Sequence, residues 1–154
     1  MISTVIVSLV RGMYAEEAWA ANIELDELST LEELHEAIQE AVDFDNEHLY
    51  SYFVSRRDSR SSREYYDDDN GLIFSKTLKD LFPLPPDRCL FYLFDWGDEW
   101  VFKISLSRKR PHEPVNGLEY PRVVSESGIR PVQYPEEEYE EDDEEDDDGE
   151  ADDA

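Results

Sequence analysis

Hydrophobic and polar positions alternate most clearly between Cys89 and Lys109. Leu90, Tyr92 and Phe94 alternate with other apolar residues, whereas after residue 99 apolar side chains alternate with mostly polar ones. A period of two is that of a β-strand. The pattern therefore predicts a central hairpin whose first strand is covered on both faces and whose second strand has one wetter face. We expect Gly97 to supply the positive φ that the turn of this hairpin needs.

Three further apolar stretches have the character of strands. Thr4–Val10 and Ala18–Leu25 are separated by a short polar segment, and together they predict an opening hairpin. His48–Val54 is rich in aromatic and β-branched residues, which favour strands. The chain is therefore expected to begin with two strands and to form a third near residue 50.

The segment between the second and third strands has the spacing of an amphipathic helix that ends near Asp43. Its apolar positions recur at intervals of three and four: Leu31, Leu34, Ile38, Ala41 and Val42. Ser29 or Thr30 is the expected N-cap, since a glutamate follows each by three residues and completes a capping box. The other face, including Glu36 and Gln39, is expected to face water. The order at the start of the chain is thus β-β-α-β.

The rest of the chain is less regular. Residues 56–70 are charged and rich in serine, which is typical of an exposed loop. Leu72–Phe74 is assigned to a short strand and Thr77–Phe82 to a turn or two of helix that the following prolines end. Pro111–Pro135 carries five of the eight prolines, and we expect it to be ordered but irregular. Together these elements predict an α+β fold, in which a mostly antiparallel sheet packs against one main helix, in a single domain over residues 1–135.

Charge separates the end of the chain from its body. Residues 136–154 hold 15 of the 40 acidic residues and no basic residue, which leaves 25 acidic against 14 basic residues, a net charge of −11, in residues 1–135. A segment this polar buries too little apolar surface to offset its ordering entropy. We therefore expect a disordered acidic tail from Glu136 to Ala154 that cannot lie on an acidic body.

Composition also restricts the partners and the compartment. The total charge of −26 repels nucleic acid, and the basic clusters, Arg56–Arg63 and Arg108–Arg110, fall in expected loops or strand ends. The single cysteine, Cys89, excludes an internal disulfide and suits a reducing compartment. The one apolar run near the N-terminus lacks the features of a signal peptide or a membrane span. A cytoplasmic protein without nucleic-acid or membrane partners is expected, and the oligomeric state stays open.

Three motifs carry a resemblance to a known family. They are Thr30-Leu31-x-x-Leu34-His35-x-x-Ile38-Gln39, then His48-Leu49-Tyr50 with Phe53, and finally Tyr92-x-Phe94-Asp95-x-Gly97-Asp98-x-Trp100. Over roughly residues 3–124 the chain resembles the plasmid pRiA4b ORF-3-like family, in which a TLxxLHxxIQ helix precedes a strand and a YxYDFGDxW hairpin. Trp96 replaces the usual Phe of the turn, and the Pro-Pro-Glu-Asp segment that follows the hairpin in the family is missing. The resemblance implies a small α+β fold of uncharacterised function, with some relatives described as passenger proteins of mobile elements, and it does not imply an enzyme.

A few residues invite a chemical interpretation. His35, His48, Asp95 and Asp98 are of the types that form a two-histidine, carboxylate metal site or a hydrolytic site. No HxH or HxxxH spacing supports a metal site, and carboxylates beside a turn glycine commonly accept hydrogen bonds from turn N–H groups. Structural roles are therefore preferred, and no cofactor is expected. Trp96, at the tip of the turn, is the aromatic residue most exposed to a partner.

Two functional hypotheses remain open. The first is a non-catalytic protein-interaction or adaptor module, whose acidic tail binds a partner protein with a basic surface or mimics nucleic acid. The second is a small metal-dependent or hydrolytic enzyme that uses His35, His48, Asp95 and Asp98. Convergence of these four side chains in one concave site would favour the enzyme.

Overall fold

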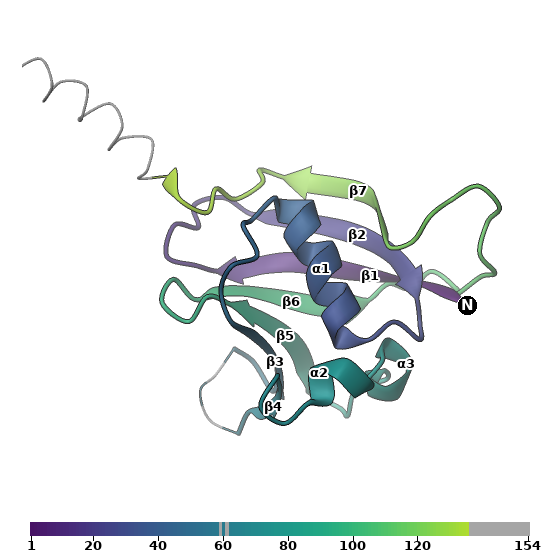
Figure 1. Ribbon diagram of the computed structural model, residues 1–154, viewed down its shortest axis with the longest axis horizontal. Coiled ribbons are helices and arrows are strands. Elements are labelled where there is room, and N and C mark those ends of the chain that lie inside the picture. Colours follow the sequence, from purple (N-terminus) through teal and green to yellow (C-terminus); the bar gives the residue numbers. More distant parts are fainter. Residues whose placement is uncertain (59, 61, 136–154) are drawn as a thin grey trace, which may run out of the picture.

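The computed structural model describes residues 1–58, 60 and 62–135. The predicted acidic tail lies outside the described residues. The chain forms seven strands and three helices within them (Figure 1). The strands are β1 (Ile2–Arg11), β2 (Trp19–Asp26), β3 (Tyr50–Ser55), β4 (Glu64–Tyr66), β5 (Cys89–Phe94), β6 (Trp100–Leu106) and β7 (Arg122–Gly128). The helices are α1 (Leu31–Val42), α2 (Leu72–Ser75) and α3 (Leu78–Leu81).

All seven strands join one antiparallel sheet in the order β4-β3-β5-β6-β1-β2-β7. The predicted α+β class is therefore confirmed, as are the β-β-α-β start and the hairpin of β5 and β6 at the centre of the sheet. Every residue of β5 after Cys89 is buried, whereas β6 exposes Lys103. This difference matches the alternation in the sequence, since β5 has apolar residues on both faces and β6 on one.

Helix α1 begins with the expected capping box. Thr30 accepts a hydrogen bond from the backbone N–H of Glu33, and the Glu33 side chain accepts one from the backbone N–H of Thr30, so two otherwise unpaired donors are satisfied. The helix ends at Asp43, whose φ of 61° is left-handed. One expectation for this helix is wrong: Gln39 is buried and not on the water face, because its side chain reaches the sheet and donates a hydrogen bond to the Tyr92 hydroxyl.

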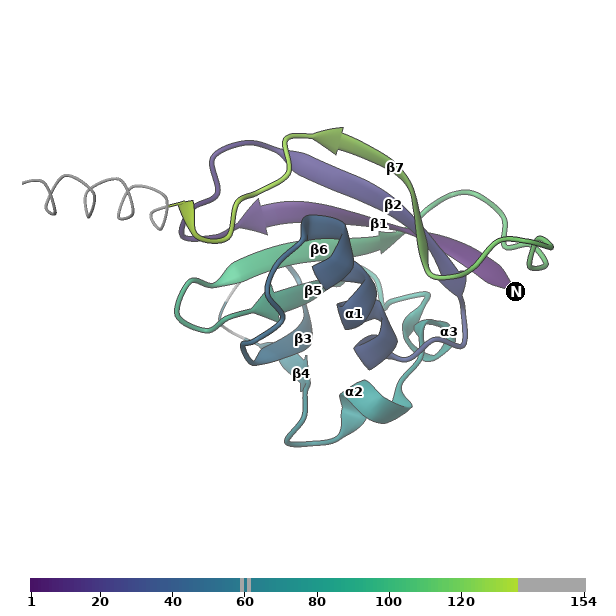
Figure 2. The ribbon, with the colours of Figure 1, turned by 45° about the horizontal axis from the view of Figure 1, so that its top comes forward.

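The sheet has an apolar cluster on each face. Helix α1 lies on one face, where it buries Leu34 and Ile38 against a core that includes Tyr92, Phe94 and Trp100. Figure 2 shows the sheet curving around this helix, with α2 and α3 beyond the N-terminal end of α1. The opposite face, called the far face below, carries a smaller cluster made of Phe53, Phe91, Leu93 and Val101.

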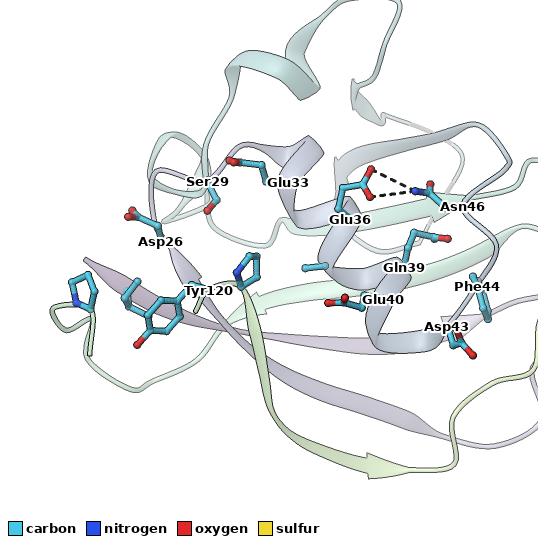
Figure 3. Close-up of a pocket in the computed structure, with 14 residues that line it drawn as sticks. Asp26, Ser29, Glu33, Glu36, Gln39, Glu40, Asp43, Phe44, Asn46 and Tyr120 are labelled. Carbon is cyan, nitrogen blue, oxygen red and sulfur yellow. Dashed lines mark hydrogen bonds between the residues drawn. The ribbon is translucent and has the colours of Figure 1, made fainter. Parts of the chain in front are cut away.

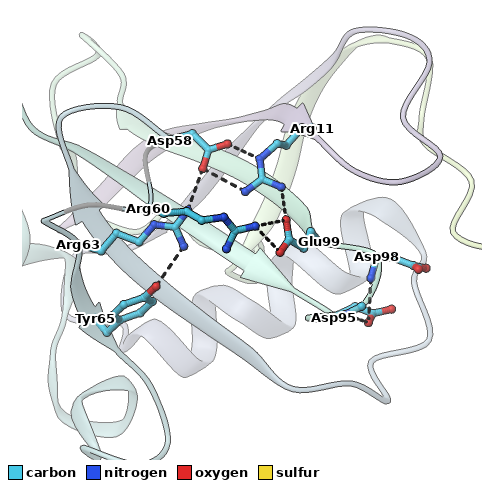
Figure 4. Close-up of polar contacts among 9 residues, drawn as sticks. Arg11, Asp58, Arg60, Arg63, Tyr65, Asp95, Asp98 and Glu99 are labelled. Carbon is cyan, nitrogen blue, oxygen red and sulfur yellow. Dashed lines mark hydrogen bonds and ion pairs between the residues drawn. The ribbon is translucent and has the colours of Figure 1, made fainter.

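The segment after β3 covers the far face through a network of ion pairs (Figure 4). Asp58 pairs with Arg11 of β1 and with Arg63, whose guanidinium lies 3.8 Å from the centre of the Phe53 ring. Glu99, beside the β5–β6 turn, accepts hydrogen bonds from Arg11 at 2.6 Å and from Arg60 at 2.8 Å. The hydrogen bonds from Arg60 and Arg11 hold the pKa of Glu99 below its ordinary value. These contacts join the predicted exposed loop to the sheet.

Three segments differ from the sequence prediction. Leu72–Ser75 is a helical turn and not a strand, because its backbone hydrogen bonds are local. The N–H of Leu72 donates to the Asn70 side chain, and the N–H of Phe74 donates to the carbonyl of Gly71. Part of the predicted loop, β4, pairs with β3 at one edge of the sheet. At the other edge, β7 pairs with β2 although its sequence is proline-flanked and mostly exposed. Short edge strands leave a weak periodic signal, since one of their sides has no neighbour.

The expected role of Gly97 in the hairpin turn is also wrong. Positive φ values belong to Asp95 at 68° and Glu99 at 52°, and Gly97 is not in the left-handed region. The Asp95 carboxylate accepts hydrogen bonds from the backbone N–H groups of Gly97 at 3.0 Å and Asp98 at 3.4 Å. An aspartate that caps the turn in this way tolerates the left-handed conformation itself, so the glycine is not needed for it.

Candidate functional site

A groove of about 740 Å³ runs beside α1. One wall is α1 and the other includes the loop before β7 with Tyr120, as Figure 3 shows. Its volume lies in the range of ligand-binding sites in proteins. The groove is therefore the candidate binding site.

Carboxylates dominate the charge of this groove. The acidic residues that line it are Asp26, Glu33, Glu36, Glu40 and Asp43. Lysine, arginine and histidine are absent from its lining as the described residues form it. Apolar side chains, among them Phe44, Pro114 and Tyr120, complete the walls. A concave surface with one sign of charge and low-dielectric walls concentrates its field, so this groove attracts cationic groups.

Helix geometry places four of these carboxylates together. Glu33, Glu36, Glu40 and Asp43 are spaced by three, four and three residues, which is the spacing of one helix face. The apolar stripe of α1 faces the sheet, so the acidic face is left to line the groove. Like charges at this spacing destabilise an isolated helix by a few tenths of a kcal/mol per pair, so tertiary packing stabilises α1 against its own repulsion.

A hydrogen-bonded network runs from the exposed rim of the groove to the buried core. Glu36 accepts hydrogen bonds from the Asn46 amide at 3.3 and 3.5 Å, and Asn46 Oδ1 lies 2.7 Å from His35 Nε2. His35 Nδ1 lies 2.6 Å from the Tyr92 hydroxyl, which also accepts a hydrogen bond of 2.9 Å from Gln39 Nε2. These contacts suit a neutral imidazole with its proton on Nε2, because Tyr92 then donates to Nδ1. Burial also lowers the pKa of His35, which favours the same neutral form.

One buried acceptor in this network has no hydrogen-bond partner among the described residues. Gln39 Oε1 makes no hydrogen bond with any described residue, although Gln39 is 4% exposed and belongs to the lining of the groove. Leaving a buried amide oxygen unpaired costs about 1–3 kcal/mol. Ser51 Oγ and Trp100 Nε1 are also buried without a partner among the described residues, and of these three residues Gln39 is the one that lines the groove.

The predicted site residues divide between two places. His35 is stacked on Tyr50, with ring centres 3.6 Å apart, and is held by Tyr92 and Asn46 as described above. His48 lies instead at the end of β5, with Nε2 3.7 Å from an Asp95 carboxylate oxygen and 2.6 Å from the Tyr134 hydroxyl. The two histidines share contact with the Phe94 ring but no polar partner. The structure thus brings together His48 and Asp95, and it places His35 in a separate network.

The second cluster anchors the last described residues. The Tyr134 hydroxyl donates to Asp45 at 2.9 Å, and the Gln133 side chain accepts from the backbone N–H of Asp45 at 2.8 Å. Burial, followed by the hydrogen bond with Asp45, raises the pKa of Tyr134. Within residues 1–135 as described, no group of three or more histidine, cysteine, aspartate or glutamate side chains is arranged to hold a metal ion. The contacts of this cluster join Gln133 and Tyr134 to Asp45 and His48, in the segment before β3.

Trp96 lies at the tip of the β5–β6 turn and is 46% exposed. Asp98 lies in the same turn, and its backbone N–H is held by the Asp95 carboxylate while its carbonyl accepts from the N–H of Met13 at 2.9 Å. Neither Trp96 nor Asp98 lines the acidic groove. The turn and the groove are thus separate features of the surface.

Sequence reasoning did not single out the groove. The glutamates of α1 were expected on a water-facing helix surface, and that surface is indeed exposed, but the pattern gives no sign of an opposite wall. The wall consists of Pro114, Tyr120 and Pro121, more than 70 residues later in the chain. A charged helix face with unbroken acidic spacing was the available signal, and it could not show concavity.

The fold and the groove together define a small α+β protein with an acidic groove beside its main helix. The chain belongs to the plasmid pRiA4b ORF-3-like protein family, whose sequence model matches residues 12–141. It is also similar in structure to a protein of unknown function, MM3350, from Methanosarcina mazei Go1, with a TM-score of 0.64 and 21% identity. That similarity covers 81% of this chain and 68% of the other, and at this identity it shows a shared fold alone. None of the curated proteins matches the chain.

The family and the similar structure leave the function uncharacterised. The described helices also include none that is long and apolar enough to cross a membrane.

Proposed function

We propose that this protein is a non-catalytic interaction module that binds a basic segment of a partner protein in the acidic groove beside α1. The observation that carries the proposal is the groove itself, a volume of about 740 Å³ whose lining, among the described residues, has five carboxylates and no basic side chain. A lysine- or arginine-rich segment complements this charge, and the aromatic and proline side chains of the walls can pack against its aliphatic stems.

Concavity separates this proposal from the plain effect of an acidic surface. In a chain with a net charge of −26, carboxylates are common everywhere on the surface. Most solvated charges contribute little to binding, since water and salt screen them. Carboxylates gathered around one groove act on the same bound segment and are partly shielded from solvent by it. Gln39, whose Oε1 is unpaired, also lines the groove and offers an acceptor to a donor that enters it.

The acidic residues from 136 to 154 extend the same preference for basic partners. Their 15 carboxylates steer a cationic partner toward the protein over long distances, whereas the groove supplies close contacts. We also keep the cytoplasm as the proposed compartment, on the basis of the single cysteine.

A fluorescein-labelled hexa-arginine peptide tests the groove by fluorescence anisotropy at increasing NaCl. The double variant Glu36→Gln, Glu40→Gln removes two groove carboxylates and keeps the side-chain size. At about 1 kcal/mol for each charge near the peptide, the affinity should fall by about 25-fold at low salt. The difference should shrink as salt rises, because screening weakens the remaining attraction.

The matched control is the double variant Glu64→Gln, Asp68→Asn, which removes two exposed carboxylates outside the groove. Its affinity should stay close to that of the unchanged protein. Equal weakening in both double variants would contradict the proposal, because it would mean that only the total charge attracts the peptide.

A further inference from the structure

The basic residues of the described chain fall into two groups. Arg11, Arg60, Arg63, Arg122 and Arg130 form ion pairs with carboxylates. The other nine have no ion-pair partner in the described part of the chain: Arg56, Arg57, Lys76, Lys79, Arg88, Lys103, Arg108, Lys109 and Arg110. Of these nine, Arg56, Arg57, Arg88 and Lys103 are exposed and line two adjoining hollows.

These four residues gather around the start of β5, at one end of the sheet. Cys89 is paired with Ser55, so Arg56 and Arg57 follow directly after the neighbour of Cys89 in the sheet. Lys103 is paired with Phe91, whose side chain belongs to the far-face cluster, so Lys103 is on that face too. Lys103 is therefore on the face of the sheet opposite α1, and the three arginines lie beside the end of that face.

Two adjoining hollows lie at this end of the sheet, and they share Arg88 and Cys89. The first, of about 340 Å³, has mainly apolar walls with Arg88 and Lys103 as its cations; the apolar side chains are Phe82, Pro83, Leu84, Ile104 and Leu106. The second, of about 290 Å³, is lined by Arg56, Arg57, Arg88 and Cys89, with Asp87 as its one carboxylate. An apolar hollow thus opens beside a cationic one.

We propose that these hollows bind a small amphiphilic carboxylate, with its apolar body against Phe82, Leu84 and Leu106 and its carboxylate between Arg88 and Lys103. Apolar contact supplies the affinity and the two cations fix the orientation. A single negative charge suits the site better than a polyanion, because the cations act within a few ångströms whereas the net charge of −26 repels each further anionic group. The hollows share no lining residue with the acidic groove, and the site does not depend on the proposed function.

Fluorescence titration of the full chain with anilinonaphthalene sulfonate tests this site. This probe is an apolar monoanion, and N-phenyl-1-naphthylamine is its uncharged counterpart. Arg88→Gln and Lys103→Gln should each weaken binding of the anionic probe by about fivefold, which corresponds to one charge at about 4 Å in water. Binding of the uncharged probe should not change. Lys79→Gln, which removes an exposed cation outside both hollows, should leave both probes unaffected.

Cys89 reports the location of the bound molecule. Decanoate should displace the anionic probe and should slow alkylation of Cys89 by uncharged iodoacetamide at least twofold, since Cys89 lines both hollows. The proposal would be overturned if Arg88→Gln, Lys103→Gln and Lys79→Gln weakened binding of the anionic probe equally. It would also be overturned if decanoate left the rate of Cys89 alkylation unchanged. Protection of Cys89 by a hexaglutamate peptide but not by decanoate would also overturn it, because the occupant would then be an acidic peptide segment.

Discussion

Gly12 illustrates how one residue can depend on a contact far along the chain. A Cβ atom added to Gly12 would lie 2.3 Å from the ring of Trp100, which is fully buried. Gly97, which the sequence suggested as the critical glycine, has only the Asp95 carboxylate within contact, at 3.5 Å. Nothing near residue 12 in the sequence reveals Trp100 as its neighbour.

We expect Gly12→Ala to lower the free energy of unfolding by about 1–3 kcal/mol, because the rigid Trp100 ring would have to move within a packed core. Gly97→Ala should change it by less than about 0.5 kcal/mol. Urea denaturation of both variants measures the two effects. A larger loss for Gly97→Ala would restore the sequence-based assignment of the turn.

His35 should make stability depend on pH below neutrality. Burial lowers its pKa in the folded protein, so below the ordinary pKa of 6.5 the unfolded chain binds a proton that the folded protein excludes. The stabilisation is present above pH 6.5 and is lost as the pH falls through that value. Between pH 6.5 and 5.5 the free energy of unfolding should fall by up to about 1 kcal/mol more in the unchanged protein than in His35→Gln. Urea denaturation of both proteins at a series of pH values gives the two profiles of unfolding free energy, which should diverge below pH 6.5. Parallel profiles would mean that His35 is protonated in the folded protein.

At the scale of elements, α1 and the β5–β6 hairpin were predictable because their signals are local. A capping box, a stripe at helical spacing and an alternation of period two each lie within a dozen residues. By contrast, β7 is an edge strand whose partner, β2, lies about 100 residues earlier, so its sequence shows little periodicity. Helix α2 was mistaken for a strand since four residues are too few to distinguish the two periods.

The N-cap of α1 allows a test at this scale. Thr30→Ala removes the acceptor for the Glu33 N–H and should cost about 1 kcal/mol of unfolding free energy. Thr30→Ser keeps the hydroxyl and should restore most of this loss. Thermal denaturation of the two variants gives the comparison, and identical melting of Ala and Ser variants would show that the capping hydroxyl contributes nothing.

For the whole molecule, the charge of residues 136–154 predicts that they contribute to binding and not to the fold. A chain that ends at Pro135 should melt at nearly the temperature of the full chain, because 15 like charges gain little from a body at −11. Its binding to the hexa-arginine peptide should weaken and lose part of its salt dependence. Unfolding or aggregation of the shorter chain would contradict this prediction, and so would peptide binding that ignores the truncation.

The sequence by itself determined the class of the fold, the main helix with its cap and the central hairpin, because local periodicity and capping chemistry encode them. It also indicated the family, through motifs that the chain keeps in order. Only the tertiary structure decided that His35 and His48 lie in separate networks, that Gln39 is buried, and that α1 faces Tyr120 across a groove. It likewise decided that Arg56, Arg57, Arg88 and Lys103 meet at one end of the sheet. These features join residues tens of positions apart, and which distant segments meet depends on strand order and sheet curvature, for which no local pattern carries a signal.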